Sequence, residues 1–277
     1  MQIYTFIYRL LMSVGMAVLA TQAVAVELPE LDCLVEPHMV VEVSSPVGGV
    51  IQTIHVDRSD VVQEGQTLAE LESAVEQASV ELARARATMD AEVKSSATNF
   101  AFNKRKYKRI KQLYGKKAVP FHQKDEARTD LKLAQLKVRQ AKRNKKVAEL
   151  ELKRAEEILK RRTVKSPIAG VVVARWKSPG EFVEEEPIVK LAQIDPLRVE
   201  VVAPASLFGS IKPGLRAEIK PEVQQDDSYI GTVSVVDRIV DAASGTFGVR
   251  LELPNPDHRL PGGLKCRVRF LVDVASP

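Results

Sequence analysis

The clearest pattern in the chain is a heptad repeat of apolar and small residues within residues 73–162. In the second half of this stretch they recur at alternating steps of four and three, and Lys145 fills the one missing position. Such spacing predicts an amphipathic helix with a single buried seam, as in a coiled coil. The seam consists of Ala127, Leu131, Ala134, Val138, Ala141, Ala148, Leu152, Ala155 and Leu159.

The first half of the same stretch keeps these steps in two registers. One set is Leu71, Val75, Ala78, Leu82, Ala85 and Met89, and the next is Val93, Ala97, Phe100, Tyr107, Ile110 and Tyr114. The sets are offset by a four-residue phase jump, which predicts a locally unwound supercoil in a helix that continues.

Helix-ending and helix-starting signals divide the stretch into two arms. Ser73 with Glu76 predicts a capping box at its start. Gly115 and Pro120 predict a turn, since glycine tolerates the left-handed end of a helix and proline suits the beginning of the next. Two antiparallel arms of roughly 40 residues would each reach about 60 Å. An ordinary packed bundle is the alternative interpretation of the heptads.

A repeated β pattern flanks the helical stretch. Residues 43–64 and 164–185 align at a constant offset of 121, and each copy is typical of a strand, a Ser-Pro-x-x-Gly turn and two further short strands. Two such units are expected to pack on each other as one small sandwich. The identical pairs are Val43/Val164, Ser45/Ser166, Pro46/Pro167, Gly49/Gly170, Val50/Val171, Val62/Val183 and Glu64/Glu185.

These residues resemble the two halves of the biotinyl/lipoyl-like domain of periplasmic adaptor proteins, also called membrane fusion proteins or HlyD-type secretion proteins. The segment 45–50 with 62–71 resembles the first half, and 165–172 resembles the second. The resemblance covers residues from about 33 to 275. It implies an adaptor that links an inner-membrane transporter, of resistance-nodulation-division or ABC type, to an outer-membrane channel in an efflux or type I secretion system. We also expect several copies to pack side by side into a ring, because apolar residues such as Leu133, Leu136 and Leu150 lie beyond the heptad seam and leave surface for neighbours.

The resemblance also implies contact residues at the tip of the helical hairpin. Arg109, Leu113 and Pro120 stand at the spacing of the family's Arg-x3-Leu-x6-Ser motif, which meets the channel in adaptors of that type. Pro120 departs from the motif's serine and removes a capping hydroxyl, whereas Gln123 keeps the position of the reciprocal partner.

A lipoyl or biotinyl carrier is the competing function for the half-repeats. Such a carrier holds its cofactor on a lysine at the turn between the halves. The turn from Leu71 to Val75 contains no lysine, so no cofactor is expected.

After Asp195 the chain changes to short β-rich runs broken by Gly and Pro, which predict a small β-barrel. The expected fold is therefore α+β, elongated and modular: an antiparallel coiled-coil α-hairpin inserted between two halves of a lipoyl/biotinyl-like β-sandwich, followed by a β-barrel. The expected segments are a signal peptide at 1–25, an N-terminal strand joining the β-barrel at 26–42, lipoyl-like halves at 43–72 and 163–194, the hairpin at 73–162 and the β-barrel at 195–277.

The N-terminus predicts export. Arg9, an apolar run over 10–20 and the small-x-small site ending at Ala25 are typical of a cleaved signal peptide. An uncleaved anchor is the alternative, although the run is shorter than the roughly 20 residues that span a bilayer. The protein is thus expected in the periplasm, associated with the inner membrane through its partner. There, Cys33 and Cys266 could pair or stay two buried thiols.

Charge is unevenly distributed. Residues 73–162 hold 25 Lys or Arg against 11 Asp or Glu, whereas the rest of the chain has a balance of −9 within the total of +5. The basic hairpin suggests an extracytoplasmic polyanion- or nucleic-acid-binding protein as an alternative function. A solvated helix surface explains the charge better in an exported protein, so no nucleic acid is expected as partner.

The sequence offers no convergent set of reactive groups. His38, His55, His122 and His258 lie in different segments without neighbouring ligands or nucleophiles, and no metal-spaced cluster or phosphate-binding loop is recognisable. We therefore expect no enzyme, no catalytic residue and no metal site.

Overall fold

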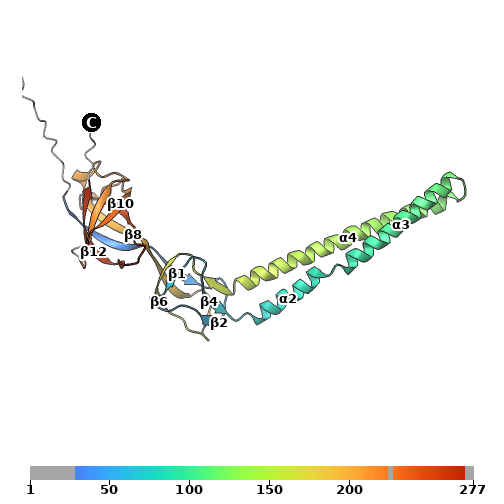
Figure 1. Ribbon diagram of the computed structural model, residues 1–277, viewed down its shortest axis with the longest axis horizontal. Coiled ribbons are helices and arrows are strands. Elements are labelled where there is room, and N and C mark those ends of the chain that lie inside the picture. Colours follow the sequence, from blue (N-terminus) through green and yellow to red (C-terminus); the bar gives the residue numbers. More distant parts are fainter. Residues whose placement is uncertain (1–28, 224–226, 272–277) are drawn as a thin grey trace, which may run out of the picture. The chain divides into compact units, whose positions relative to one another are not determined.

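The computed structural model describes residues 29–223 and 227–271. The signal peptide predicted at 1–25 lies outside the described residues. The chain divides into two units, His38–Ile194 and the two flanking pieces Met1–Pro37 and Asp195–Pro277. Figure 1 shows the order of the elements along the chain.

Two long strands contribute to both units. β1 (Leu31–Ser44) contains the first division point and β8 (Pro187–Pro204) contains the second. The other strands of the His38–Ile194 unit are β2 (Gly49–Ile54), β3 (Val61–Val62), β4 (Thr67–Leu71), β5 (Thr163–Lys165), β6 (Gly170–Arg175) and β7 (Phe182–Val183).

The two β repeats exchange strands with each other. β2 of the first repeat pairs with β7 of the second, with Gly49 opposite Val183. β6 of the second repeat pairs with β3 of the first, with Gly170 opposite Val62. Because the repeats are offset by 121 residues, Gly49 corresponds to Gly170 and Val62 corresponds to Val183. The two repeats therefore pair with each other in the same way at both places. The prediction that the halves close into a single β domain is confirmed by this register.

The Ser-Pro-x-x-Gly turns are built alike in both repeats. Buried Ser45 donates its hydroxyl proton to the Val47 carbonyl, and buried Ser166 donates to the Ile168 carbonyl, each at 2.6 Å. A hydroxyl that satisfies a carbonyl two residues ahead fixes a tight turn inside a low-dielectric core. Gly170 has a further role, because a Cβ there would lie 2.2 Å from the backbone oxygen of Ala192.

The sandwich has one shared hydrophobic core. Its fully buried side chains come from both repeats and from β8, including Ile51, Leu68, Val172 and Leu191. Neither repeat could remove these residues from water alone, so burial of apolar area, at about 25 cal/mol per Å², favours closing the two halves together.

Three helices lie between β4 and β5 in the sequence: α2 (Ala74–Thr88), α3 (Ala91–Gly115) and α4 (Phe121–Lys160). α2 and α3 pack along α4 (Figure 1). The seam predicted for α4 is confirmed: Ala127, Ala134 and Ala141 are buried, and the other seam positions are only partly exposed.

The seam predicted for α2 is wrong. Val80, Ala83 and Ala87 are the buried residues of α2, whereas Leu82 is exposed and Val75 is 75% exposed. The two sets have the same spacing, so periodicity alone could not choose between them. The observed seam places small alanines against α4, which allows close approach of the helices, and leaves larger side chains outside.

The first arm is also not one continuous helix. α2 ends at Thr88, Met89 adopts an extended conformation (φ −68°, ψ 109°), and α3 begins at Ala91 after Asp90. The four-residue phase jump is thus accommodated by a break, not by unwinding. A hollow of about 400 Å³ opens at the break and is lined by Met89, Val93 and Lys145 among others.

The predicted capping box does not form. Ser73 is the N-cap of α2 but makes no capping hydrogen bond with its side chain, and accepts instead from the Gln77 side chain at 2.9 Å. Glu76 pairs with Arg162, its carboxylate accepting from Nη2 at 2.6 Å. The guanidinium of Arg162 adds charge–charge attraction that a neutral backbone amide does not offer, which explains why Glu76 turns away from the cap.

Arg162 joins the hairpin to the sandwich. Besides Glu76 it donates through Nη1 to the Gly48 carbonyl at 2.9 Å, and its own carbonyl accepts from the Leu71 amide at 2.8 Å. Arg162, two residues after the end of α4, thereby contacts both the first turn of α2 and the first β turn. The hydrogen bond from Arg162 lowers the pKa of Glu76.

The other unit is a six-stranded antiparallel barrel with the strand order β1-β12-β9-β10-β11-β8, and β1 and β8 also pair. β9 is Arg216–Pro221, β10 Tyr229–Val236, β11 Thr246–Leu253 and β12 Leu264–Leu271, and a short 3₁₀ helix covers Ala205–Leu207. Buried residues alternate along the strands, as in Phe247, Val249 and Leu251, so one face forms the barrel core.

No helix among the described residues is long and apolar enough to cross a membrane.

Arg162→Met should lower the free energy of unfolding of the His38–Ile194 unit by about 2 kcal/mol, because it removes two hydrogen bonds and leaves Glu76 unpaired. Arg161→Met, an exposed neighbour, is the matched control and should change it by less than about 0.5 kcal/mol. The measurement is denaturant unfolding followed by circular dichroism.

The same pair predicts a pH dependence. Since the folded-state pKa of Glu76 is lowered from 4.5, its stabilisation is complete above that value and is lost as the pH falls below it. The difference between wild type and Arg162→Met should therefore shrink between pH 6 and about pH 3. A difference that stays constant over this range would contradict the role given to the pair.

Candidate functional site

The turn between α3 and α4 forms the tip of the hairpin, and its backbone follows a Schellman motif. The Ala118 amide donates to the Leu113 carbonyl at 3.0 Å and the Lys117 amide to the Tyr114 carbonyl at 2.9 Å. The left-handed residue of the motif is Lys117, with φ 60°, whereas Gly115, which the sequence suggested for this role, is still helical. A non-glycine residue at this position is uncommon.

The three residues predicted for the tip lie around this turn. Arg109 and Leu113 are one helical turn apart on α3, so both point to the same face, and both are exposed. Pro120 is the N-cap of α4 and forms no side-chain cap. Arg109 and Leu113 thus place one cation and one apolar side chain near Pro120, where the second arm starts.

An aromatic cluster that sequence reasoning missed stands beside these residues. The rings of Tyr114 and Phe121 meet edge to face, with 6.2 Å between their centroids. The Lys124 ammonium lies 4.5 Å from the Tyr114 centroid and 5.6 Å from that of Phe121. Such cation–π contacts fix the first turn of α4 against the last turn of α3. The spacing of an aromatic residue on each side of Pro120 was the available signal.

An ion pair ties α3 to α4 further from the tip. Lys106 on α3 donates to Asp130 on α4 at 2.9 Å, and this hydrogen bond raises the pKa of Lys106. The pair crosses between antiparallel helices and therefore fixes their register near the tip.

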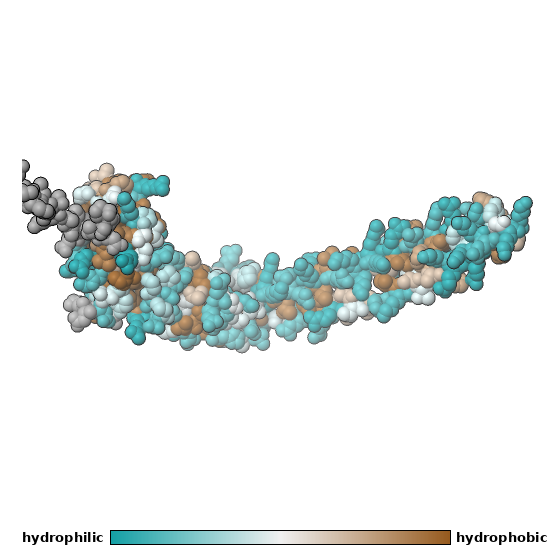
Figure 2. Space-filling model, turned by 45° about the horizontal axis from the view of Figure 1, so that its top comes forward, coloured by the Kyte–Doolittle hydropathy of each residue, from teal (hydrophilic) through white to brown (hydrophobic). Residues whose placement is uncertain are grey.

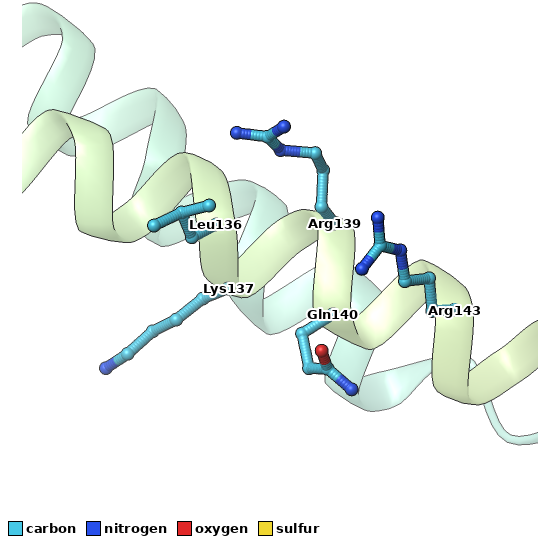
Figure 3. A pocket seen from close by; sticks show the side chains of 5 residues that line it. All are labelled: Leu136, Lys137, Arg139, Gln140 and Arg143. Carbon is cyan, nitrogen blue, oxygen red and sulfur yellow. The ribbon is translucent and has the colours of Figure 1, made fainter.

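A second candidate site, on the outer surface of α4, is a shallow hollow of about 280 Å³. Leu136, Lys137, Arg139, Gln140 and Arg143 line it, and Figure 3 shows that all five extend from this single helix. Because no second element closes over it, the hollow holds no enclosed ligand site. Its three cations are those expected of a solvated helix face.

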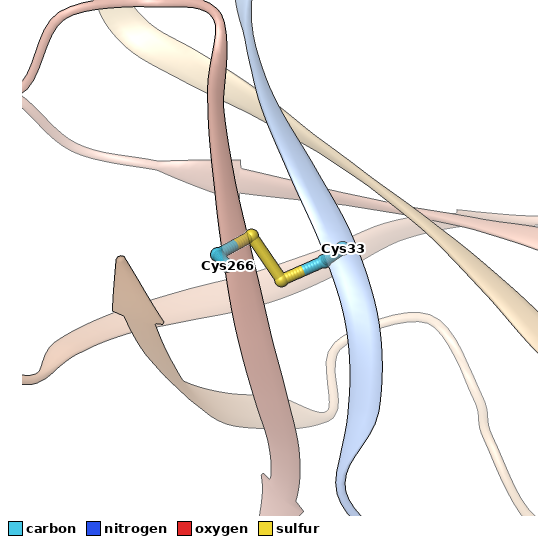
Figure 4. The surroundings of a disulfide bond; sticks show 2 residues. All are labelled: Cys33 and Cys266. Carbon is cyan, nitrogen blue, oxygen red and sulfur yellow. A yellow bond between two sulfur atoms is a disulfide. The ribbon is translucent and has the colours of Figure 1, made fainter. Parts of the chain in front are cut away.

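The two cysteines are joined. Cys33 on β1 and Cys266 on β12 face each other across the antiparallel pair, with 4.9 Å between their Cα atoms, and form a disulfide (Figure 4). Both are buried in the barrel unit. The bond links two strands from opposite ends of the sequence.

The described residues show no group of three or more His, Cys, Asp or Glu side chains that could hold a metal ion. Of the four histidines, His55 lies 3.4 Å from Glu70 and the others lie on separate elements. No arrangement of acid, base and nucleophile is formed by the residues singled out above.

Two domain families match the chain. Residues 39–193 match the "CzcB-like, barrel-sandwich hybrid domain" and residues 197–272 the "CusB-like, beta-barrel domain". The chain is 25% identical to "Multidrug export protein AcrE" of Escherichia coli (strain K12) over 256 residues, which cover 87% of this chain and 63% of that protein. It is 28% identical to "Multidrug resistance protein MdtE" of the same strain, over 95% of this chain and 68% of the relative.

Solved structures show the same fold. MacA from Actinobacillus actinomycetemcomitans matches with a TM-score of 0.72 and 22% identity, covering 88% of this chain and 78% of that one. The membrane fusion protein Spr0693 from Streptococcus pneumoniae R6 matches with a TM-score of 0.59 and 16% identity, covering 89% of this chain and 100% of that one. The present chain spans 63% of the length of the curated relative AcrE.

The disulfide gives a direct prediction. Cys33→Ser with Cys266→Ser should lower the free energy of unfolding of the barrel unit by about 2–5 kcal/mol, because the unfolded chain loses a long-range constraint. Alkylation followed by mass spectrometry should find no reactive thiol in the wild-type chain isolated without reductant, and two once a reductant is added. Two free thiols before reduction would contradict the bond.

Proposed function

The chain belongs to the membrane fusion protein family, whose CzcB-like domain match covers more than half of it, and we propose that it acts as a periplasmic adaptor. In this role it links an inner-membrane transporter, of resistance-nodulation-division or ABC type, to an outer-membrane channel. The names of similar proteins support a role in efflux, among them "Multidrug efflux pump subunit AcrA" and "Toluene efflux pump periplasmic linker protein TtgA".

The observation that carries this proposal is the helical hairpin between β4 and β5. α4 alone has 40 residues, and its buried positions form one narrow seam of mainly small side chains against α2 and α3. A seam this narrow is typical of a two-stranded coiled coil, not of the core of a packed bundle. Such a hairpin buries little and extends far, which suits a protein that connects two partners.

The competing functions fit less well. A lipoyl or biotinyl carrier needs a lysine in a free turn between the halves, but here β4 ends at Leu71 and α2 begins at Ala74 with no lysine between them. A polyanion binder would use the densest basic stretch of α4, which is Lys142, Arg143, Lys145 and Lys146. Lys145 of this stretch, however, lies at the helix break near Asp90 and only partly faces solvent. As an adaptor the chain needs no catalytic site, because the transporter supplies the energy.

Within the pump we assign channel contact to Arg109, Leu113 and Pro120 at the tip. Export by a signal peptide at 1–25 would place the chain in the periplasm, and the transporter would hold it at the inner membrane.

Self-association into a ring is the third part of the proposal. Exposed apolar side chains recur along α4 outside its seam, at Leu133, Leu136, Val147, Leu150 and Ile158. Others are exposed on α2, at Val75 and Leu82, and at the break that follows it, at Met89. Figure 2 shows hydrophobic side chains at intervals along the helices among hydrophilic ones. Neighbouring copies would cover these surfaces.

Charge reversal at the tip should weaken channel binding. Arg109→Glu is expected to reduce co-purification of the outer-membrane channel from cross-linked cells about tenfold. A channel surface that attracts the Arg109 cation would repel a carboxylate at the same position. Arg139→Glu, exposed on α4 away from the tip, is the matched control and should leave it unchanged. Equal recovery of the channel with both variants would remove Arg109 from the contact.

A charge introduced among the exposed apolar residues of α4 should weaken self-association into a ring. Leu150→Glu is expected to shift sedimentation from oligomer towards monomer, because a carboxylate would be buried between copies. The melting temperature of the monomer should change little, since Leu150 is exposed. A purely monomeric wild-type chain at all concentrations, or a variant with unchanged self-association, would argue against this surface.

A further inference from the structure

The hairpin tip carries more positive than negative charge, although Asp125 and Glu126 of α4 follow Lys124 directly. From Val93 to Lys124 the chain contains ten Lys or Arg residues and no Asp or Glu. Two of the ten form ion pairs, Lys94 with Asp90 and Lys106 with Asp130. The remaining eight form no ion pair with any residue that the structure describes. They are Lys104, Arg105, Lys108, Arg109, Lys111, Lys116, Lys117 and Lys124.

Lys117 adopts a backbone conformation that favours glycine, so a charged residue stands where local geometry prefers a residue without a side chain. This residue occupies the left-handed position of the Schellman motif, with φ 60°, where glycine would fit without a steric penalty from Cβ. Gly115 stands only two residues away in an ordinary helical conformation. The fold of the turn therefore does not explain a lysine at this position.

Exposed apolar side chains lie within the same turn. Phe121 is 61% exposed and Leu113 is 44% exposed. Phe121 is nevertheless held in place, because its ring contacts Tyr114 edge to face and Lys124 lies near both rings. Aromatic residues, Phe among them, are enriched at protein–protein interfaces, and a ring that is already held in place loses little conformational freedom on binding.

We infer that Leu113, Lys116, Lys117 and Phe121, which we call the tip surface, bind a protein surface rich in Asp and Glu with a small apolar pocket. This inference rests on the proposed function, which brings the tip to an outer-membrane channel, and it specifies the chemistry that the channel presents. The flanking cations of α3 add long-range attraction, and Phe121 gives the contact its short-range specificity.

A nucleic acid or a membrane fits the tip surface less well. Proteins that bind single strands use free aromatic faces along a groove, whereas the Tyr114 ring is already covered by Lys124. Helices that bind membranes lay a long apolar face into the lipid, whereas the tip offers two apolar residues at a turn. A compact acidic protein surface matches both the charge and the small apolar area.

The decisive variant removes charge without harming the fold. Lys116→Ala with Lys117→Gly takes away two cations and gives the left-handed position its preferred residue, so the full-length chain should melt at the same or a higher temperature. The matched control is Lys137→Ala with Lys142→Ala, which removes two exposed cations from α4 away from the tip. Phe121→Ala tests the aromatic contribution separately.

Binding of the full-length chain to the purified outer-membrane channel is measured at 50 and 300 mM salt, with poly-L-glutamate as competitor. At 50 mM salt the tip variant should bind about fivefold more weakly than wild type and show a smaller salt dependence, while the control should bind like wild type. Phe121→Ala should weaken binding about tenfold at both salt concentrations. Poly-L-glutamate should compete with the wild-type chain.

Equal binding by the tip variant and wild type would overturn the inference. Binding to duplex DNA or to vesicles of anionic phospholipid at 150 mM salt that is lost in the tip variant alone would also overturn it, in favour of those partners. If cross-linking in cells recovers no channel, but the chain is retained on poly-L-glutamate and the tip variant is not, the adaptor role fails and the acidic-surface inference stands.

Discussion

The structure depends on the exchange of strands between the two β repeats, because neither repeat can bury its apolar residues by itself. Gly49 pairs with Val183 and Gly170 with Val62, so each half supplies an edge strand to the other. Ile51 and Leu68 from the first half and Val172 from the second are buried only when both halves are present. The hairpin is consequently a closed loop whose two ends are held at one place, and Arg162 joins that place to the first turn of α2.

The sequence predicted the parts that follow from periodicity along regular elements. The constant offset of the β repeats predicted the shared sandwich, and the α4 heptads predicted the buried side of that helix. α2 shows the limit of this reasoning, because two sets of residues had the same spacing and tertiary packing selected the smaller ones. The break at Met89 could not be foreseen either, since a phase jump is compatible with unwinding or with interruption.

The tip illustrates a different limit. Arg109, Leu113 and Pro120 could be named because their spacing matches a family motif, but the shape of the turn comes from residues outside it. Lys117 takes a conformation usually given to glycine, and Lys124 covers the ring of Tyr114. The aromatic residues on each side of Pro120 were a signal for a cluster, but neither the conformation of Lys117 nor the position of Lys124 over the ring has a sequence signature, because each depends on where the two helices end relative to each other. The same residues give the tip its basic and aromatic character, which is the basis for the chemistry inferred for its partner.

The exchange of strands can be tested by cross-linking. Val61 and Val171 are directly opposite each other in the β3–β6 pairing although 110 residues separate them in the sequence. In a chain with Cys33→Ser and Cys266→Ser, Val61→Cys with Val171→Cys should form an intramolecular disulfide on mild oxidation. Val61→Cys with Val147→Cys, on the exposed side of α4, should not. A 61–171 pair that cross-links no better than this control would contradict the shared sandwich on which the account rests.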